Sequence, residues 1–113
     1  MVGSKTKIKS SGSGKGRRFG IVVSKFNETI TKRLFKACYA ELLRHGVREK
    51  DLTVVWVPGS LELPIAALKL GNKKTIDGVI CLGTIIRGET IHFDLVAYGA
   101  TYGIAHAALL TKK

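Results

Sequence analysis

The chain has 113 residues, a formal net charge of +11 at pH 7 and a hydrophobic content of 45%. This length allows one domain with a modest core, since domains typically span about 100–150 residues. No apolar run approaches the ~20 residues that cross a bilayer, and the cysteines, Cys38 and Cys81, form neither a disulfide framework nor a metal-ligand cluster. We therefore expect a soluble protein of the cytoplasm, without a membrane partner and without a metal.

The basic charge is concentrated near the ends of the chain. Six of the 19 Lys and Arg residues lie in residues 1–18, and two more are Lys112 and Lys113. The body between them is only mildly basic. It contains no RNP-type, KH-type or zinc-finger signature, and its aromatic residues are not interleaved with bases as in stacking platforms. These features argue against nucleic acid as a specific partner.

Residues 1–18 are rich in Gly, Ser and Lys, contain no acidic residue and show no apolar periodicity. This composition predicts a disordered basic arm ahead of an α/β domain over residues 19–113. The absence of acids is also typical of organellar transit segments, which leaves a plastid as the alternative to the cytoplasm.

Three short apolar runs rich in β-branched residues predict strands. They lie at 19–24 (FGIVVS), 52–57 (LTVVWV) and 78–86 (GVICLGTII). Continuous apolar runs of this kind are expected of strands that are buried on both faces of a parallel sheet.

A helix is predicted over about 28–45, where apolar residues recur at four-residue spacing. Asn27 or Thr29 can cap its first turn with a side-chain oxygen. Gly46 can take the left-handed conformation that ends many helices.

Two further helices follow the second and third strands. Ser60 can cap the first of them, and Pro64 falls within the first turn, where proline is tolerated. The second is expected over 91–110, although Gly99 and Gly103 weaken it by about 1 kcal/mol each relative to alanine.

Alternating strands and helices predict a three-layer αβα sandwich, in which a parallel sheet with right-handed crossovers has helices on both faces. In such sheets ligands bind outside the carboxyl ends of the strands. The loops expected there, 25–28, 58–62 and 87–92, are all chemically distinctive. Their coincidence at one edge of the sheet predicts a site.

The third loop, Arg87-Gly88-Glu89-Thr90, leaves a strand and opens a helix. Gly88 allows the backbone to approach a ligand, and unpaired amides at a helix start attract anions, so one interpretation is a phosphate cradle. The Glu89 carboxylate must then point away while its amide points inward. The alternative is that Gly88 is only a turn residue and Thr90 only a helix cap.

His92 follows in the first turn of the same helix. The positive end of the helix dipole disfavours the imidazolium form there, and a neutral ring can accept a proton. This position suits a general base or proton shuttle. Lone histidines more often have structural roles, and that interpretation applies with greater force to His45 and His106.

The other two loops offer complementary chemistry. Phe26 has a flat face on which a heteroaromatic ring could stack, and the turn at 60–62 offers amides and the Glu62 carboxylate to hydroxyl and ring-nitrogen groups. Singly, Phe26 could be a core residue and Glu62 a first-turn acid. Together with an anion cradle and a histidine, they predict ligands with a ring, hydroxyls and a phosphate.

Three motifs resemble the 6,7-dimethyl-8-ribityllumazine synthase family: KFNE at 25–28, VPGSLELP at 57–64 and LGTIIRGETIHFD at 82–94. The similarity covers about residues 18–110. It implies a flavodoxin-like sheet and the condensation of 5-amino-6-ribitylaminouracil with 3,4-dihydroxy-2-butanone 4-phosphate in riboflavin synthesis, without a cofactor.

The resemblance also implies a role for each matching residue. Phe26 would stack on the pyrimidine in a substrate-binding loop that includes Asn27. The ribityl chain and ring would be held by Ser60, Leu61, Glu62, Ile85 and Ile86. Phosphate would be bound by Gly88, Glu89 and Thr90, and His92 would be the catalytic proton shuttle.

Some family features differ or are missing. Leu61 stands where the family usually has an aromatic residue, and Ile91 stands where it usually has proline. We expect the fold to lack the family's last strand and C-terminal helices, which supply an arginine and an aromatic wall to the neighbouring subunit's site. The resemblance implies a homo-oligomer, either a pentamer or a larger shell. The alternative to an enzyme is a non-catalytic ligand-binding or assembly module.

Overall fold

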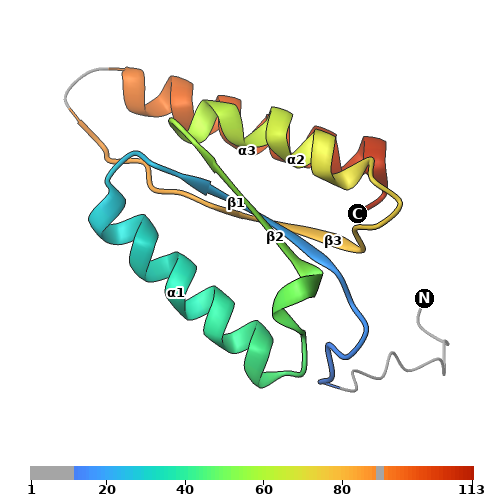
Figure 1. Cartoon of the computed structure of the whole chain (residues 1–113). Helices are drawn as coiled ribbons and strands as arrows, with labels where there is room; N and C mark the ends of the chain where they lie inside the picture. The colour runs from blue at the N-terminus through green and yellow to red at the C-terminus, as the bar shows by residue number, and fades with distance from the viewer. Residues whose placement is uncertain (1–11, 89–90) are drawn as a thin grey trace, which may run out of the picture.

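Figure 1 shows the chain as a computed structural model, which describes residues 12–88 and 91–113. Strands and helices alternate along it as predicted. The elements are β1 (Phe19–Ser24), α1 (Glu28–Arg44), β2 (Leu52–Val57), α2 (Leu63–Gly71), β3 (Gly78–Leu82) and α3 (His92–Thr111), with the short 3-10 helices η1 (Glu49–Asp51) and η2 (Ser60–Glu62) before β2 and α2.

The described strands form one parallel sheet with the order β2-β1-β3. Phe19 at the start of β1 lies opposite Leu52 of β2 on one side and Gly78 of β3 on the other. Because β1 is the central strand, its residues Ile21 and Val22 are 0% exposed. The predicted burial of this run on both faces is therefore confirmed.

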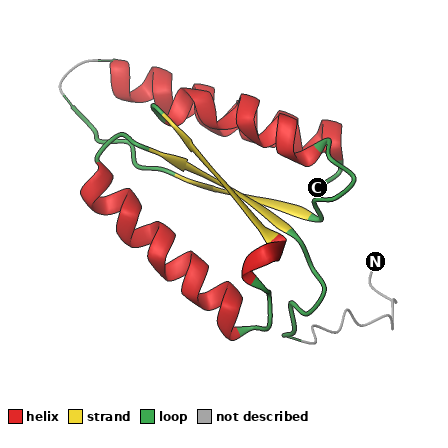
Figure 2. Cartoon of the chain, viewed as in Figure 1, coloured by secondary structure: helices red, strands yellow, loops and turns green. Residues whose placement is uncertain are grey.

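The helices lie on both faces of the sheet. In Figures 1 and 2, α1 lies on one face, and α2 and α3 lie together on the other. The core between the sheet and helices α2 and α3 includes Val22, Val57, Leu63 and Leu70. This arrangement confirms the predicted three-layer αβα sandwich.

The two ends of α1 are built differently. At its C-terminal end Gly46 has φ +95°, its amide donates to the Leu43 carbonyl, and the Val47 amide donates to the Leu42 carbonyl. This pair of hydrogen bonds is a Schellman motif, so the predicted role of Gly46 is confirmed. At the other end Asn27 is left-handed, with φ 57° and ψ 59°, and its side chain makes no capping hydrogen bond. The prediction of a side-chain cap was wrong.

The third strand is shorter than the predicted run 78–86. β3 ends at Leu82, opposite Val23, and β1 itself ends one residue later at Ser24, so residues 84–86 have no partner among the described strands to continue the ladder. All residues of β3 are half-buried. Burial on both faces was therefore wrongly predicted for this strand, which lies at an edge of the described sheet.

The predicted cap of the second helix was also wrong. Ser60 begins η2, and α2 begins only at Leu63, with Pro64 in its first turn as predicted. The Ser60 hydroxyl donates instead to the carbonyl oxygen of Thr84, at 3.4 Å. The Ser60 hydroxyl is therefore bonded to a residue distant in the sequence and not to an amide in the first turn of the helix.

The glycines of α3 are packing positions. A Cβ atom on Gly103 would lie 2.5 Å from Cγ of Pro64, and one on Gly99 would lie 2.7 Å from Cδ2 of Leu61. Contacts this short exclude any side chain without movement of the neighbour. The two glycines therefore allow α3 to lie against η2 and α2 in spite of their low helix propensity.

The segment before β1 contacts the domain within the described residues. The Gly14 amide donates to the His45 carbonyl at 2.7 Å, and Arg18 is hydrogen-bonded to Asp77 through both its backbone and its side chain. Of the predicted disordered arm over 1–18, residues 1–11 lie outside the described residues.

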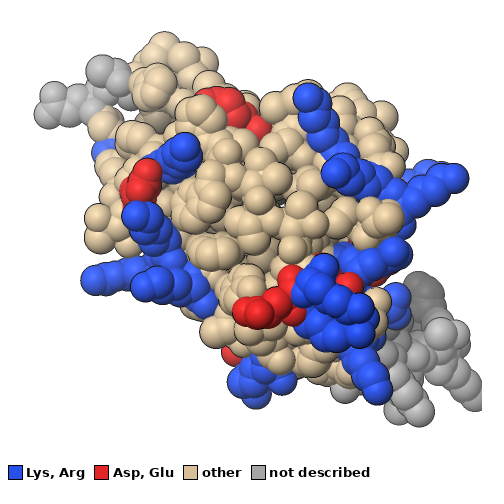
Figure 3. Space-filling model, viewed as in Figure 1, with Lys and Arg blue, Asp and Glu red and all other residues tan. Residues whose placement is uncertain are grey.

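Figure 3 shows basic side chains at both the left and the right of the molecule, and the group at the right lies at the amino ends of the strands. Among the described residues, nine bases stand before the strands or just after α3: Lys15, Arg17, Arg18, Arg48, Lys50, Lys73, Lys74, Lys112 and Lys113. Only Glu49, Asp51 and Asp77 oppose them in the same loops. Nine bases against three acids leave an excess of positive charge at this end of the sheet, opposite the carboxyl-terminal loops.

Candidate functional site

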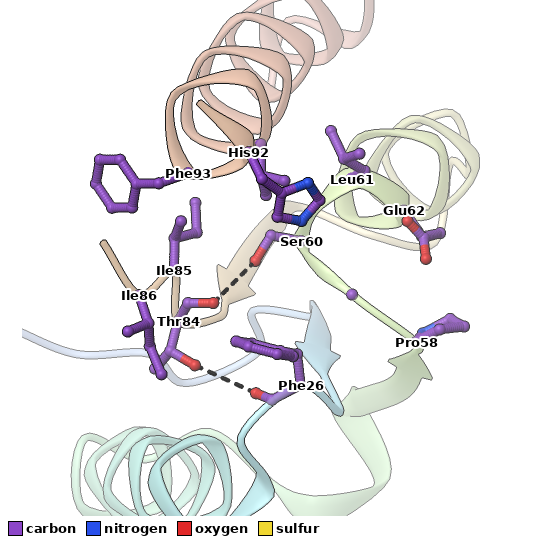
Figure 4. Close-up of a pocket in the computed structure, with 12 residues that line it drawn as sticks. Phe26, Pro58, Ser60, Leu61, Glu62, Thr84, Ile85, Ile86, His92 and Phe93 are labelled. Atoms are coloured by element: carbon purple, nitrogen blue, oxygen red, sulfur yellow. Dashed lines mark hydrogen bonds between the residues drawn. The ribbon is translucent and has the colours of Figure 1, made fainter. Parts of the chain in front are cut away.

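The three loops at the carboxyl ends of the strands surround one cavity of about 290 Å³ (Figure 4). Phe26 contributes to it from the loop after β1, residues 58–62 from the loop after β2, and residues 84–86 from the segment after β3. The first turns of α3 close it with His92, Phe93 and Val96. The sheet topology thus brings together segments that are far apart in the sequence.

Most of the predicted site residues line this cavity. They are Phe26, Ser60, Leu61, Glu62, Ile85, Ile86 and His92. Asn27 and Gly88 are not among the described lining residues, and two further predicted residues, Glu89 and Thr90, lie outside the described part of the chain.

Asn27 serves the backbone of α1. Its carbonyl oxygen accepts hydrogen bonds from the amides of Ile30 and Thr31, at 3.0 and 3.2 Å. Its left-handed conformation turns the chain from β1 into the helix. Its contribution to the cavity is therefore indirect, through the direction that the chain takes after Phe26.

Gly88 is exposed, and a Cβ atom there would have no heavy atom of the described residues within 4 Å. No close packing requires a glycine at this point, which is consistent with a backbone that is open to a ligand. The predicted phosphate cradle continues into Glu89 and Thr90, outside the described part of the chain. It stays a prediction.

The cavity combines an apolar surface with a few polar groups. Phe26, Ile85, Ile86, Phe93 and Val96 provide apolar side chains. Phe26 is 51% exposed, so part of it is accessible to a ligand. Hydroxyl, carboxylate and imidazole groups come from Ser60, Thr84, Glu62 and His92. Such a lining fits a flat heteroaromatic ring with polar substituents.

His92 is the first residue of α3 and belongs to the lining. In Figure 4 its ring projects from the helix toward the cavity, on the side of Leu61 and Ser60. It therefore lies where a proton could be exchanged with a ligand bound against Phe26 and Ile85. The other described histidines, His45 and His106, are outside this lining.

A cation lies at the edge of the cavity. The guanidinium carbon of Arg87 is 4.8 Å from the centre of the Phe93 ring, and Phe93 is part of the lining. A cation over an aromatic face is a favourable contact that also restrains the side chain. Arg87 therefore keeps positive charge close to the segment that was predicted to bind phosphate.

Thr84, Phe93 and Val96 are lining residues that the sequence reasoning missed. Thr84 was not recognised as a site residue because the third strand was expected to continue through Ile86. A signal was present, since β-branched polar residues are unusual in a strand buried on both faces. Val96 lies three residues after Phe93 and four residues after His92, which is the spacing of neighbours on a helix face.

The described residues contain neither a candidate metal site nor a candidate membrane-spanning helix. No group of three or more His, Cys, Asp or Glu side chains in residues 12–88 and 91–113 is placed to hold a metal ion. No helix in the same part of the chain is long and apolar enough to span a membrane.

The fold and the cavity together define a class. A parallel αβα sandwich with the strand order 2-1-3 and a mixed apolar and polar cavity outside the carboxyl ends of its strands is a ligand-binding α/β protein of the flavodoxin-like type. Within this class, the sequence model of the 6,7-dimethyl-8-ribityllumazine synthase family matches residues 16–113. The chain belongs to that family.

Proposed function

We propose that this protein catalyses the lumazine synthase reaction of riboflavin biosynthesis. The substrates are 5-amino-6-ribitylaminouracil and 3,4-dihydroxy-2-butanone 4-phosphate, and the products are 6,7-dimethyl-8-ribityllumazine, inorganic phosphate and water. The observation that carries the proposal is the convergence of Phe26, Glu62, Ile85 and His92 on one cavity in a chain of this family.

The chemistry divides among the lining residues. Phe26 and Ile85 contact the faces or edges of the pyrimidine. Ser60 and Glu62 form hydrogen bonds with the ribityl hydroxyls and the ring. The 5-amino group of the uracil attacks the ketone of the butanone phosphate, water leaves to give an imine, and phosphate is eliminated. Ring closure then expels a second water. His92 carries protons in these steps.

Phosphate binding completes the proposal. The segment 88–90 is predicted from the sequence to bind phosphate through backbone amides, and Arg87 supplies nearby charge from its position over Phe93. Much of the rate comes from holding two substrates side by side, which is worth up to about 7–11 kcal/mol in ideal cases.

The test is lumazine formation by purified protein from the two substrates. Replacing His92 with alanine should lower kcat about 10²–10⁴-fold, as expected for the loss of a general acid or base. His106→Ala is the matched control, because His106 lies on the same helix and outside the cavity lining. Wild-type turnover no faster than the uncatalysed condensation would exclude the enzymatic function. Calorimetric binding of the uracil without turnover would favour the ligand-binding module.

A homo-oligomer is part of the proposal. Large apolar side chains on α3 are exposed in the single chain, among them Leu95, Tyr98, Tyr102 and Leu109. Exposed apolar surface of this kind is typical of subunit interfaces. Sedimentation velocity distinguishes a pentamer from a larger shell, and a monomer at all concentrations would contradict the proposal.

A further inference from the structure

Thr84 connects all three loops of the cavity through two hydrogen bonds. Its hydroxyl donates to the carbonyl oxygen of Phe26 at 3.2 Å, and its own carbonyl oxygen accepts from the Ser60 hydroxyl at 3.4 Å. Both bonds are drawn in Figure 4. Residues from the ends of β1 and β2 are thereby attached to the segment that follows β3.

The Thr84 hydroxyl controls the direction of the Phe26 backbone. The Phe26 amide donates to the Ser24 hydroxyl at 3.3 Å, and the Phe26 carbonyl accepts from Thr84, so both polar groups of this residue are held by side-chain hydroxyls. The next residue, Asn27, is left-handed. Phe26 is 51% exposed, so packing restrains it only in part and these backbone hydrogen bonds contribute to its orientation.

The other hydrogen bond fixes the start of η2. Ser60 is only 5% exposed, and its hydroxyl reaches the Thr84 carbonyl across the backbone of Gly83. A Cβ atom on Gly83 would lie 3.0 Å from the Ser60 hydroxyl oxygen. The absence of a side chain at this point allows Ser60 to approach, and Ser60 in turn places Leu61 and Glu62 at the cavity.

We propose that Thr84 is a positioning residue, which sets the orientation of the Phe26 ring and the place of the turn at 60–62 for binding of the ribitylaminopyrimidine. This role rests on the proposed function. Thr84 acts through Phe26, so its removal should affect the binding of the pyrimidine more than the chemical steps at His92.

Calorimetric titration with 5-amino-6-ribitylaminouracil tests the role. Thr84→Val keeps the shape of the side chain and removes the donor, and should weaken binding about fivefold, as expected for the loss of one hydrogen bond. KM for the pyrimidine should rise in proportion while kcat stays within about twofold of wild type. Thr84→Ser should restore wild-type affinity. Thr53→Val, an exposed position on β2, is the matched control and should bind as wild type does.

A double-mutant cycle shows whether Thr84 acts through Phe26. In a Phe26→Ala background, Thr84→Val should change the affinity by less than about 1.5-fold, since there is no ring left to orient. An equal loss in both backgrounds, or no loss in the single variant, would overturn the positioning role. Melting temperatures of all variants show whether each is folded.

The Asn27 amide provides a readout without ligand. Loss of the bond to the Phe26 carbonyl should shift the Asn27 amide resonance, which belongs to the same peptide group, in Thr84→Val but not in Thr53→Val. Failure of the wild-type protein to bind the uracil, together with this shift, would overturn the proposed function and leave the orienting contact established. An unchanged Asn27 amide would overturn the contact itself.

Discussion

Reciprocal hydrogen bonds join Arg18, which precedes β1, to Asp77, which precedes β3. The guanidinium Nη2 of Arg18 lies 3.2 Å from Oδ1 of Asp77, the Arg18 amide donates to Oδ2 at 2.8 Å, and the Asp77 amide donates back to the Arg18 carbonyl at 2.7 Å. Arg18 also donates to the Lys74 carbonyl. These contacts hold together the amino ends of two neighbouring strands.

This connection predicts a pH-dependent contribution to stability. The hydrogen bond from the Arg18 side chain, followed by the one from its amide, holds the pKa of Asp77 below its usual value. A lowered pKa in the folded state stabilises the protein above the unfolded-state value of about 3.9, and the contribution is lost as the pH falls through the folded-state pKa.

Urea unfolding of the wild type and of Asp77→Asn between pH 7 and pH 2 measures this contribution. The wild type should be the more stable at pH 7, and the difference should shrink below about pH 4. A difference that is constant over the whole range would show that the charge of Asp77 is irrelevant.

The contact of Gly103 with Pro64 predicts the effect of adding one methyl group. Alanine usually stabilises a helix interior by about 1 kcal/mol relative to glycine. At Gly103 the new Cβ would lie 2.5 Å from a rigid proline ring, and overpacking of this kind costs about 1–3 kcal/mol. Gly103→Ala should therefore lower the free energy of unfolding or at best leave it unchanged, as measured by chemical denaturation.

Gly99→Ala is the informative comparison on the same helix. Its new Cβ would meet only Cδ2 of Leu61, the end of a flexible side chain that is 51% exposed. Leu61 can rotate away at little cost, so Gly99→Ala should be more stable than Gly103→Ala. The reverse order would mean that the backbone of α3 moves to relieve both contacts.

Thr31 offers a position at which stability should rise. Its side chain is 0% exposed, and its hydroxyl has no hydrogen-bond partner among the described residues. Burial of an unsatisfied hydroxyl costs about 1–3 kcal/mol, and valine has nearly the same shape and helix propensity. Thr31→Val should raise the free energy of unfolding by about 1 kcal/mol.

Serine separates the hydroxyl from the methyl group at the same position. Thr31→Ser keeps the unsatisfied oxygen and leaves a small void, so it should be less stable than the wild type. Destabilisation by Thr31→Val would indicate that the hydroxyl has a partner in solution.

The two thiols should react slowly in the folded protein. Burial raises the pKa of both Cys38 and Cys81 above the ordinary thiol value. Because the thiolate is the nucleophile, the rate of alkylation by iodoacetamide should rise at higher pH in the native protein than in the denatured chain. Cys38→Ser isolates the profile of Cys81, and identical native and denatured profiles would contradict the prediction.

Strands with strong local signals were predicted closely from the sequence. β1 and β2 have the predicted bounds, and Gly46 ends α1 as its left-handed conformation allows. The end of β3 could not be predicted in this way, because it depends on where β1 ends rather than on the apolar residues Ile85 and Ile86. Strand length is set by the partner as well as by the sequence of the strand.

The candidate site was predicted from chemistry that is concentrated in short loops. Phe26, Glu62 and His92 stand out as residue types that a structural loop rarely needs together. Thr84 does not stand out, since its role follows from a hydrogen bond to a residue 58 positions away. Ser60 was misassigned for the same reason, because a local cap is visible in a sequence and a tertiary acceptor is not.

The gathering of nine bases at the amino ends of the strands gives the molecule an electrical polarity, with the ligand cavity at the opposite pole. The six-residue strand β1 is about 20 Å long, more than twice the Debye length of about 8 Å at physiological ionic strength, so fields from these charges are largely screened at the cavity. Isoelectric point, adsorption to surfaces and solubility can therefore be altered at Lys73, Lys74 or Lys112 while the electrostatic environment of the cavity stays the same. Colloidal behaviour and the properties of the cavity can evolve independently.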